Sequence, residues 1–157
     1  MAGIDWGYVH AFACEIVGVS GSGRLSVIGE VYRRGALIED LIPVLLRLQG
    51  ALDIEAFYAD PSEPEYIAAC QRKGVSIIGA TNDVLPGINA VSAAMRQGMT
   101  IDPACQGLLT ELPTYRWAPE RSTGGFREKP VEEGDDACDA LRYAVMALAE
   151  SGVLLYI

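Results

Sequence analysis

Hydrophobic and polar residues alternate in the first part of the chain with the period of a β-strand. Residues 3–5 begin one such strand, which resumes over 11–17, and residues 25–32 alternate as another. The cluster Ser-Gly-Ser-Gly at 20–23 lies between the last two and is typical of a turn. This pattern predicts an antiparallel hairpin near the start of the chain.

The rest of the chain shows helical spacing of apolar residues, interrupted by short apolar runs. The predicted helices cover 36–49, 62–73, 83–96, 103–112 and 135–150, and the predicted short strands cover 54–59, 75–78 and 99–101. Helices that alternate with short strands favour parallel pairing through crossover connections. We therefore expect an α/β fold whose mixed sheet combines the antiparallel hairpin with parallel strands and carries helices on both faces.

Local signals refine the boundaries of these elements. Ser62 followed by Glu65 has the spacing of a capping box, and Gly74 is expected to end the same helix. Pro103 suits the first turn of the fourth helix. The segment 118–134 is rich in Pro and Gly, which predicts a long loop.

The composition fits one domain of 157 residues, half of them hydrophobic, with no apolar run long enough for a membrane span and no secretory signal. The formal net charge of −9 disfavours a broad basic surface for nucleic acid. A site that gathers carboxylates around divalent cations has the same signature. Four cysteines show no zinc-site spacing and are predicted to be buried thiols: Cys14, Cys70, Cys105 and Cys138.

Five aspartates occupy the ends of predicted elements. Asp5 lies on the first strand, Asp60 ends an apolar strand, and Asp135, Asp136 and Asp139 fall in the first turn of the last helix. Turns or helix caps explain most of them equally well. A turn or a helix cap explains Asp139 less well, because its helix is otherwise apolar and an unpaired buried carboxylate is costly. Together they could converge on a hard divalent cation, which prefers oxygen ligands.

Several segments stand out in order along the chain: GIDWGY at 3–8, YADPSEPEYI at 58–67, NDVLPGI at 82–88, LLTELPTYRW at 108–117, and Lys129-Pro130 followed by DDACDALRYA at 135–144. Together they resemble the nuclease domain of large terminase subunits of tailed phages, within the ribonuclease-H-like superfamily. The resemblance extends over nearly the whole chain.

This resemblance implies a ribonuclease-H-like endonuclease that cuts concatemeric viral DNA during genome packaging, using two Mg²⁺ or Mn²⁺ ions. Carried over by motif, Asp5, Asp60 and Asp136 are the catalytic metal ligands, Asp139 is a further metal residue, and Asp135 is a supporting one. Many relatives have histidine where this chain has Asp136. The pattern Asp-x-x-Asp resembles Holliday-junction resolvases instead, which leaves the division between Asp136 and Asp139 open.

The resemblance also implies partners. We expect residues 1–157 to be a single nuclease domain, the C-terminal part of a longer ATPase-nuclease motor, because Gly18–Gly23 lacks the phosphate-loop pattern and its lysine. Double-stranded DNA, the portal protein and the small terminase subunit are the expected partners, with no membrane. The expected location is the bacterial host cytoplasm, transiently at the procapsid portal. Basic residues available for DNA contact are Arg33, Arg34, Arg121, Arg127 and Lys129.

Two alternatives stay open. One is a resolvase-like or transposase-like nuclease of the same fold, and the other is a non-catalytic DNA-binding or portal-binding module. The single histidine, His10, is expected to pack on a strand rather than act in catalysis.

Overall fold

The computed structural model describes residues 1–119, 126–130 and 134–152, with side chains over 1–116 and 134–152. One sheet of six strands has the order β5-β4-β1-β2-β3-β6, and a second pairs β7 with β8. The strands are β1 (Ala2–Asp5), β2 (Phe12–Val19), β3 (Leu25–Arg33), β4 (Phe57–Ala59), β5 (Ile77–Gly79), β6 (Thr100–Ile101), β7 (Trp117–Pro119) and β8 (Phe126–Pro130). The helices are α1 (Ile38–Leu52), α2 (Pro64–Arg72), α3 (Val84–Arg96), α4 (Gln106–Glu111) and α5 (Asp136–Glu150).

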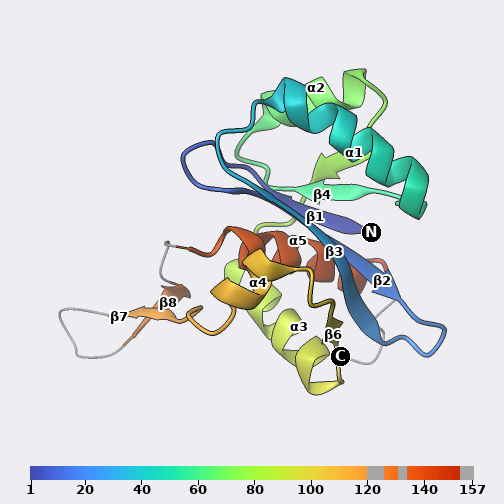
Figure 1. Cartoon of the computed structure of the whole chain (residues 1–157). Helices are drawn as coiled ribbons and strands as arrows, with labels where there is room; N and C mark the ends of the chain where they lie inside the picture. Colours follow the sequence, from blue (N-terminus) through green and yellow to red (C-terminus); the bar gives the residue numbers. More distant parts are fainter. Residues whose placement is uncertain (120–125, 131–133, 153–157) are drawn as a thin grey trace.

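The sheet is mixed, as the sequence predicts. β1, β2 and β3 pair antiparallel in turn, whereas β4 joins β1 in parallel, β5 joins β4 in parallel and β6 joins β3 in parallel. Figure 1 shows α1 and α2 over one face of this sheet and α3, α4 and α5 over the other. The predicted fold class, a mixed sheet with helices on both faces, is therefore confirmed.

Each face of the sheet has its own apolar core. Alternate residues of β2 point to opposite faces, because side chains in a strand have a period of two. Facing α5, the core contains Ala13, Val17, Val27, Leu108, Leu141, Ala144 and Val145. Facing α1 and α2, it contains Ile4, Phe12, Cys14, Ile16, Leu45, Phe57 and Ile77. All four cysteines are buried and free, as the sequence predicts.

The backbone of α5 lies directly against β1. A Cβ atom on Gly3 would collide with the carbonyl oxygen of Ala140, so only glycine allows this approach. The contact fixes the first turn of α5 near the carboxyl end of β1, where Asp5 lies. Because β4 runs parallel to β1, its carboxyl end reaches the same edge of the sheet.

Several predicted boundaries are wrong in detail. The predicted loop over 118–134 contains an antiparallel hairpin, β7–β8, in which Trp117 pairs with Pro130. The fourth helix begins at Gln106 rather than in a turn opened by Pro103. Arg121 lies outside the described residues, and so do the side chains of Arg127 and Lys129. Within the described residues, no helix is both long and apolar enough to cross a membrane.

Candidate active site

Five aspartates from three elements gather at the carboxyl edge of β1 and β4. Burial raises the pKa of Asp5 to about 8, and so, in order of effect, do the carboxylates of Asp139, Asp60, Asp136 and Asp135. Each of these groups therefore acts on Asp5 as a nearby negative charge. The structure places all five aspartates that the sequence suggested near this edge, where the other four raise the pKa of Asp5.

Asp60 is held in an Asx turn directly after β4. Its side chain accepts hydrogen bonds from the backbone N–H (3.0 Å) and hydroxyl (2.6 Å) of Ser62. Its backbone carbonyl accepts a bond of 3.1 Å from the indole N–H of Trp6. The predicted capping box is therefore wrong: Ser62 binds Asp60, and Glu63 is the N-cap of α2 without a side-chain cap bond.

Asp136 is buried at the first position of α5, with 7% of its surface exposed. Its Oδ2 atom accepts a hydrogen bond of 3.2 Å from the backbone N–H of Ala11. Its Oδ1 atom accepts none from the residues that the structure describes. One oxygen of this carboxylate is thus held by the protein, and the other has no hydrogen-bond partner among the described residues.

Asp139 lies one turn further along α5 and is paired with a buried cation. Arg142 donates to its two oxygens, with 2.8 Å from Nη2 to Oδ2 and 3.3 Å from Nε to Oδ1, and Tyr115 donates to Oδ1 at 3.4 Å. Only 2% of the Arg142 side chain is exposed. Both oxygens of Asp139 are therefore engaged, in contrast to those of Asp136.

The segment 82–88 contacts Arg142 and holds its side chain in place. Both terminal nitrogens of the guanidinium lie 3.3 Å from the side-chain oxygen of Asn82, which also accepts a bond from the Tyr143 hydroxyl. Gly87 lies against the aliphatic part of Arg142, where a Cβ would come within 2.5 Å of Cγ. Sequence reasoning missed Arg142 and Asn82, although an arginine three residues after Asp139 on an otherwise apolar helix face is a pairing signal.

Glu111 was also missed. It is 5% exposed, and its carboxylate accepts hydrogen bonds from Tyr32 on β3 and from two backbone N–H groups of α5. Burial raises its pKa, while these three hydrogen bonds lower it. Nearby, Glu15 is fully buried and has no hydrogen-bond partner among the described residues. Burial, and next the facing carboxylate of Glu30, raise the pKa of Glu15 to about 10.

The donor set suits a hard divalent cation better than zinc, because it consists of carboxylate oxygens without histidine or thiolate. Its negative charges are balanced only at Asp139, which leaves Asp5, Asp60 and Asp136 without a cation among the described residues. Within those residues, no three His, Cys, Asp or Glu side chains are grouped closely enough to hold an ion directly.

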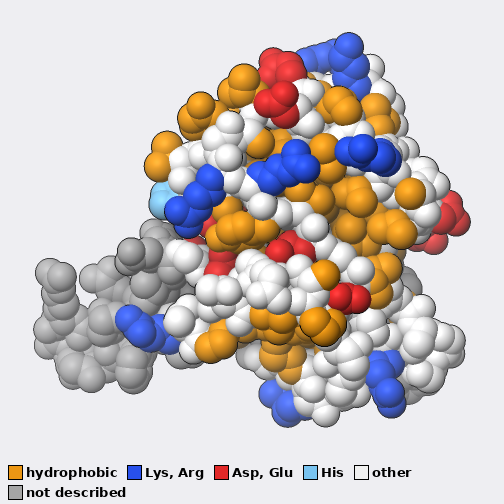
Figure 2. All heavy atoms as spheres, in the orientation of Figure 1, with side chains coloured by type: hydrophobic (Ala, Val, Ile, Leu, Met, Phe, Trp, Pro, Cys, Tyr) orange, Lys and Arg blue, Asp and Glu red, His pale blue; other side chains and the backbone are white. Residues whose placement is uncertain are grey.

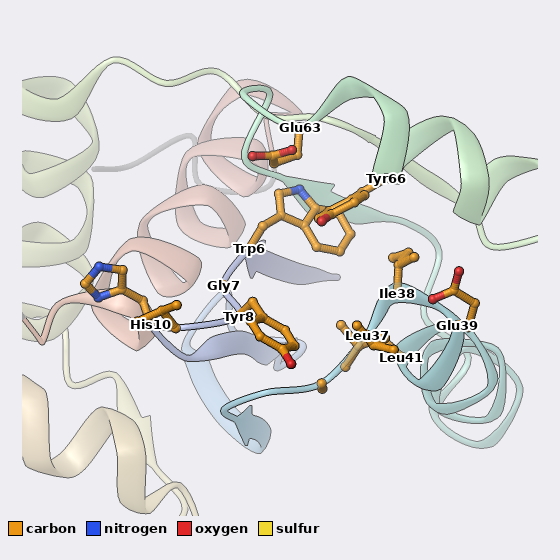
Figure 3. Close-up of a pocket in the computed structure, with 12 residues that line it drawn as sticks. Trp6, Gly7, Tyr8, His10, Leu37, Ile38, Glu39, Leu41, Glu63 and Tyr66 are labelled. Carbon is orange, nitrogen blue, oxygen red and sulfur yellow. The ribbon is translucent and has the colours of Figure 1, made fainter.

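A groove with a volume of about 600 Å³ begins at Trp6, the residue that follows Asp5, although none of the five aspartates lines it. Figure 3 shows Trp6 and Tyr66 on one side of it and Leu37, Ile38 and Leu41 across from them. Tyr8 (58% exposed) and Leu37 (55%) leave much of the groove apolar at its rim. His10 is an exposed residue of the loop between β1 and β2 and lines the groove, so the prediction that it packs on a strand is wrong.

Arg33 and Arg34 lie near the same loop. Both are exposed at the end of β3, and the backbone N–H of Gly35 donates to the carbonyl of Tyr8 at 2.9 Å. In the space-filling view, acidic side chains lie in the recess between the two helical layers and Lys and Arg side chains lie above them (Figure 2). Exposed cations thus border an acidic centre.

Comparison with known proteins gives a consistent result for the fold. No family model matches the sequence, and no curated protein matches it. Among solved structures, the large terminase of a thermophilic bacteriophage superposes with a TM-score of 0.82 at 23% identity, over 94% of this chain and 39% of the terminase. The chain therefore spans about two fifths of the length of that protein.

Isolated nuclease domains match over most of both chains. The nuclease domain of the large terminase of bacteriophage SPP1, with bound Mn, has a TM-score of 0.76 at 19% identity over 96% of this chain and 85% of the domain. The large terminase nuclease of thermophilic phage G20c, with bound cobalt, has a TM-score of 0.70 at 18% identity. The match covers 92% of this chain and 78% of that nuclease. The chain has the fold of large terminase nuclease domains, which confirms the resemblance that the motifs indicate.

Proposed function

We propose that the chain is a metal-dependent DNA endonuclease that cuts concatemeric viral DNA during genome packaging. The observation that carries this proposal is the convergence of Asp5, Asp60 and Asp136, from β1, β4 and α5, at one sheet edge in the fold of terminase nucleases. Mn and cobalt bound to two such nucleases support a divalent-ion site here. Mg²⁺ or Mn²⁺ is the proposed cofactor, with two ions.

Asp5, Asp60 and Asp136 would hold the ions. When bound, two divalent ions supply Lewis-acid stabilisation of the reacting phosphate and lower the pKa of the attacking water. Asp5 would be a ligand in this proposal, because the other carboxylates act on it as nearby negative charges. Asp136 would bind through Oδ1, which has no partner among the described residues, and Asp139 would stay paired with Arg142 beside the site. Asp135 is a proposed supporting residue, since its backbone carbonyl accepts a hydrogen bond from the N–H of Asp139.

The substrate class follows from the surroundings of the site. Arg33 and Arg34 are available for phosphate contacts beside the carboxylates, and Arg121, Arg127 and Lys129 are further candidates whose side chains are outside the description. Because the net charge is −9, we propose that the domain alone binds DNA weakly. Delivery of DNA would then depend on an ATPase domain of the same longer chain, with the portal protein and small terminase subunit as partners in the host cytoplasm.

Cleavage of supercoiled plasmid tests the proposal directly. The purified chain is expected to nick and linearise plasmid with Mn²⁺ or Mg²⁺ and to stop when EDTA removes the ion. Asp60→Asn is expected to abolish cleavage. Asp53→Asn is the matched control, because Asp53 is an exposed aspartate at the end of α1 in a left-handed conformation that asparagine also tolerates. Cleavage by Asp60→Asn at the rate of the unchanged chain would contradict the proposal.

The same assay separates the alternatives. A four-way junction cut in preference to linear duplex would favour the resolvase-like alternative. Metal-independent retention of duplex DNA without any cleavage would favour a non-catalytic binding module.

A further inference from the structure

The first turn of α5 is capped by a residue from another helix. Glu111, the last residue of α4, accepts hydrogen bonds at Oε2 from the backbone N–H groups of Ala137 (2.7 Å) and Cys138 (3.1 Å). These are the second and third residues of α5, whose N–H groups have no partner within the helix. Asp135, at the N-cap position, makes no side-chain cap bond. Glu111 therefore does for α5 what an N-cap side chain ordinarily does.

The side chain of Glu111 is held in place by a hydrogen bond from a residue of the sheet. Its Oε1 atom accepts a bond of 2.7 Å from the hydroxyl of Tyr32 on β3. Two residues earlier on the same strand, Glu30 accepts bonds from the backbone N–H groups of Gly107 (2.9 Å) and Leu108 (2.7 Å) at the start of α4. A Cβ on Gly107 would collide with the ring of Tyr32, so α4 lies close against β3. The two carboxylates link β3 to α4 and α4 to α5.

The capped turn is the one that carries Asp136. Asp136 immediately precedes Ala137, and its Oδ2 atom is held by the N–H of Ala11 near the start of β2. The turn is thus fixed at two points, by Ala11 through the Asp136 side chain and by Glu111 through the backbone. Without Glu111, the second point is lost and two buried N–H groups have no partner among the described residues.

We propose that Glu111 is a positioning residue for the metal ligands, which sets where the first turn of α5 presents Asp136 to Asp5. This inference rests on the proposed nuclease function. Hydrogen bonds that orient metal ligands from outside the coordination shell typically change metal affinity about 10–100-fold when removed. A residue that merely stabilised the fold would change the unfolding temperature without a specific effect on metal binding.

Two variants and two controls separate these outcomes. Glu111→Ala removes the acceptor, whereas Glu111→Gln keeps one side-chain oxygen that can accept both N–H groups. Ile67→Val is expected to lower stability from the apolar core under α1 and α2, and Ile67 makes no hydrogen bond to α5. Glu15→Gln changes a buried acid of the same region that has no hydrogen bond to α5. For each variant, Mn²⁺ affinity is measured by calorimetry without DNA, alongside the melting temperature and the plasmid cleavage rate.

We expect Glu111→Ala to bind Mn²⁺ about 10–100-fold more weakly and to lose cleavage in proportion. Glu111→Gln should recover most of both, and the two controls should bind Mn²⁺ like the unchanged chain. Mn²⁺ affinity in Glu111→Ala equal to that of Ile67→Val would overturn the positioning role alone. An unchanged chain that neither binds Mn²⁺ nor cuts DNA would overturn the proposed function as well, so the two failures are distinguishable.

Discussion

The two faces of the sheet are buried by different means. Against α1 and α2, the buried residues are apolar, from Ile4 and Phe12 on the sheet to Leu45 on α1. Against α5, the interior also contains all the buried polar and charged residues of the described part of the chain: Glu15, Glu111, Asp136 and Arg142. Buried charge opposes folding unless it is paired. The difference indicates that apolar packing stabilises both faces, and that only the α5 face also carries buried charged side chains.

Breaking the ion pair on the α5 face should have the largest effect on stability. Arg142→Met leaves Asp139 without its cation and Asn82 without two donors. Removing one partner of a buried pair costs about 3–5 kcal/mol, because the other charge stays uncompensated. Urea unfolding measures this loss.

The paired variant shows whether uncompensated charge is the cause. Asp139→Leu combined with Arg142→Met should recover much of the lost stability, since both charges are gone. A double variant as unstable as Arg142→Met would mean that shape rather than charge accounts for the loss.

A cavity on the opposite face should affect stability alone. Leu45→Ala removes a fully buried side chain of α1 and is expected to cost about 2–5 kcal/mol. Mn²⁺ affinity of the folded fraction, measured by calorimetry, should equal that of the unchanged chain. A large loss of affinity in this variant would remove the distinction between the two faces.

Glu15 should make the domain less stable as the pH rises. Its pKa is about 10 in the folded chain and near 4.5 when unfolded, so the folded state binds the proton more tightly. Its stabilising contribution is complete below pH 4.5 and is lost progressively up to about pH 10, by at most about 1.4 kcal/mol per pH unit. Glu15→Gln should reduce this slope, as measured by thermal unfolding at several pH values. An identical slope in both proteins would contradict the assignment.

The smallest expected loss of stability comes from removing the hydrogen bond that Tyr32 donates to Glu111. Tyr32→Phe removes the hydroxyl that donates to Oε1 and leaves the two backbone bonds at Oε2 in place. We expect a loss of about 0.5–1.5 kcal/mol by urea unfolding. Because the cap on α5 remains, Mn²⁺ affinity should change much less than in Glu111→Ala. A loss of affinity as large as in Glu111→Ala would assign the positioning to Tyr32 instead.

Much of this fold could be predicted from local pattern. Alternation indicated the β2–β3 hairpin, and Gly74 and Gly98 end α2 and α3 with positive φ, as glycine does after a helix. Motifs pointed to Asp5 and Asp60 because each lies at the end of a short apolar strand. Each of these signals depends only on residues that are close together in the sequence.

The supports of the site could not be predicted in this way. Glu111 and Ala137 are 26 positions apart, and Arg142 and Asn82 are 60 apart, so only the packed structure brings them together. Ser62 and Glu65 have the spacing of a capping box, yet the nearer carboxylate of Asp60 takes the Ser62 hydrogen bonds. The contacts of Glu111 and Arg142 depend on tertiary packing. The hydrogen bonds of Ser62 depend on which of two nearby carboxylates it binds.

The most direct test of the central claim is anomalous scattering from crystals of the chain soaked in Mn²⁺. We predict ion density at the carboxyl edge of β1 and β4, with Asp5, Asp60 and the free Oδ1 of Asp136 as ligands and Asp139 still paired with Arg142. Absence of anomalous density at this edge at saturating Mn²⁺, or an ion held by Asp139 with Asp136 turned away, would contradict it.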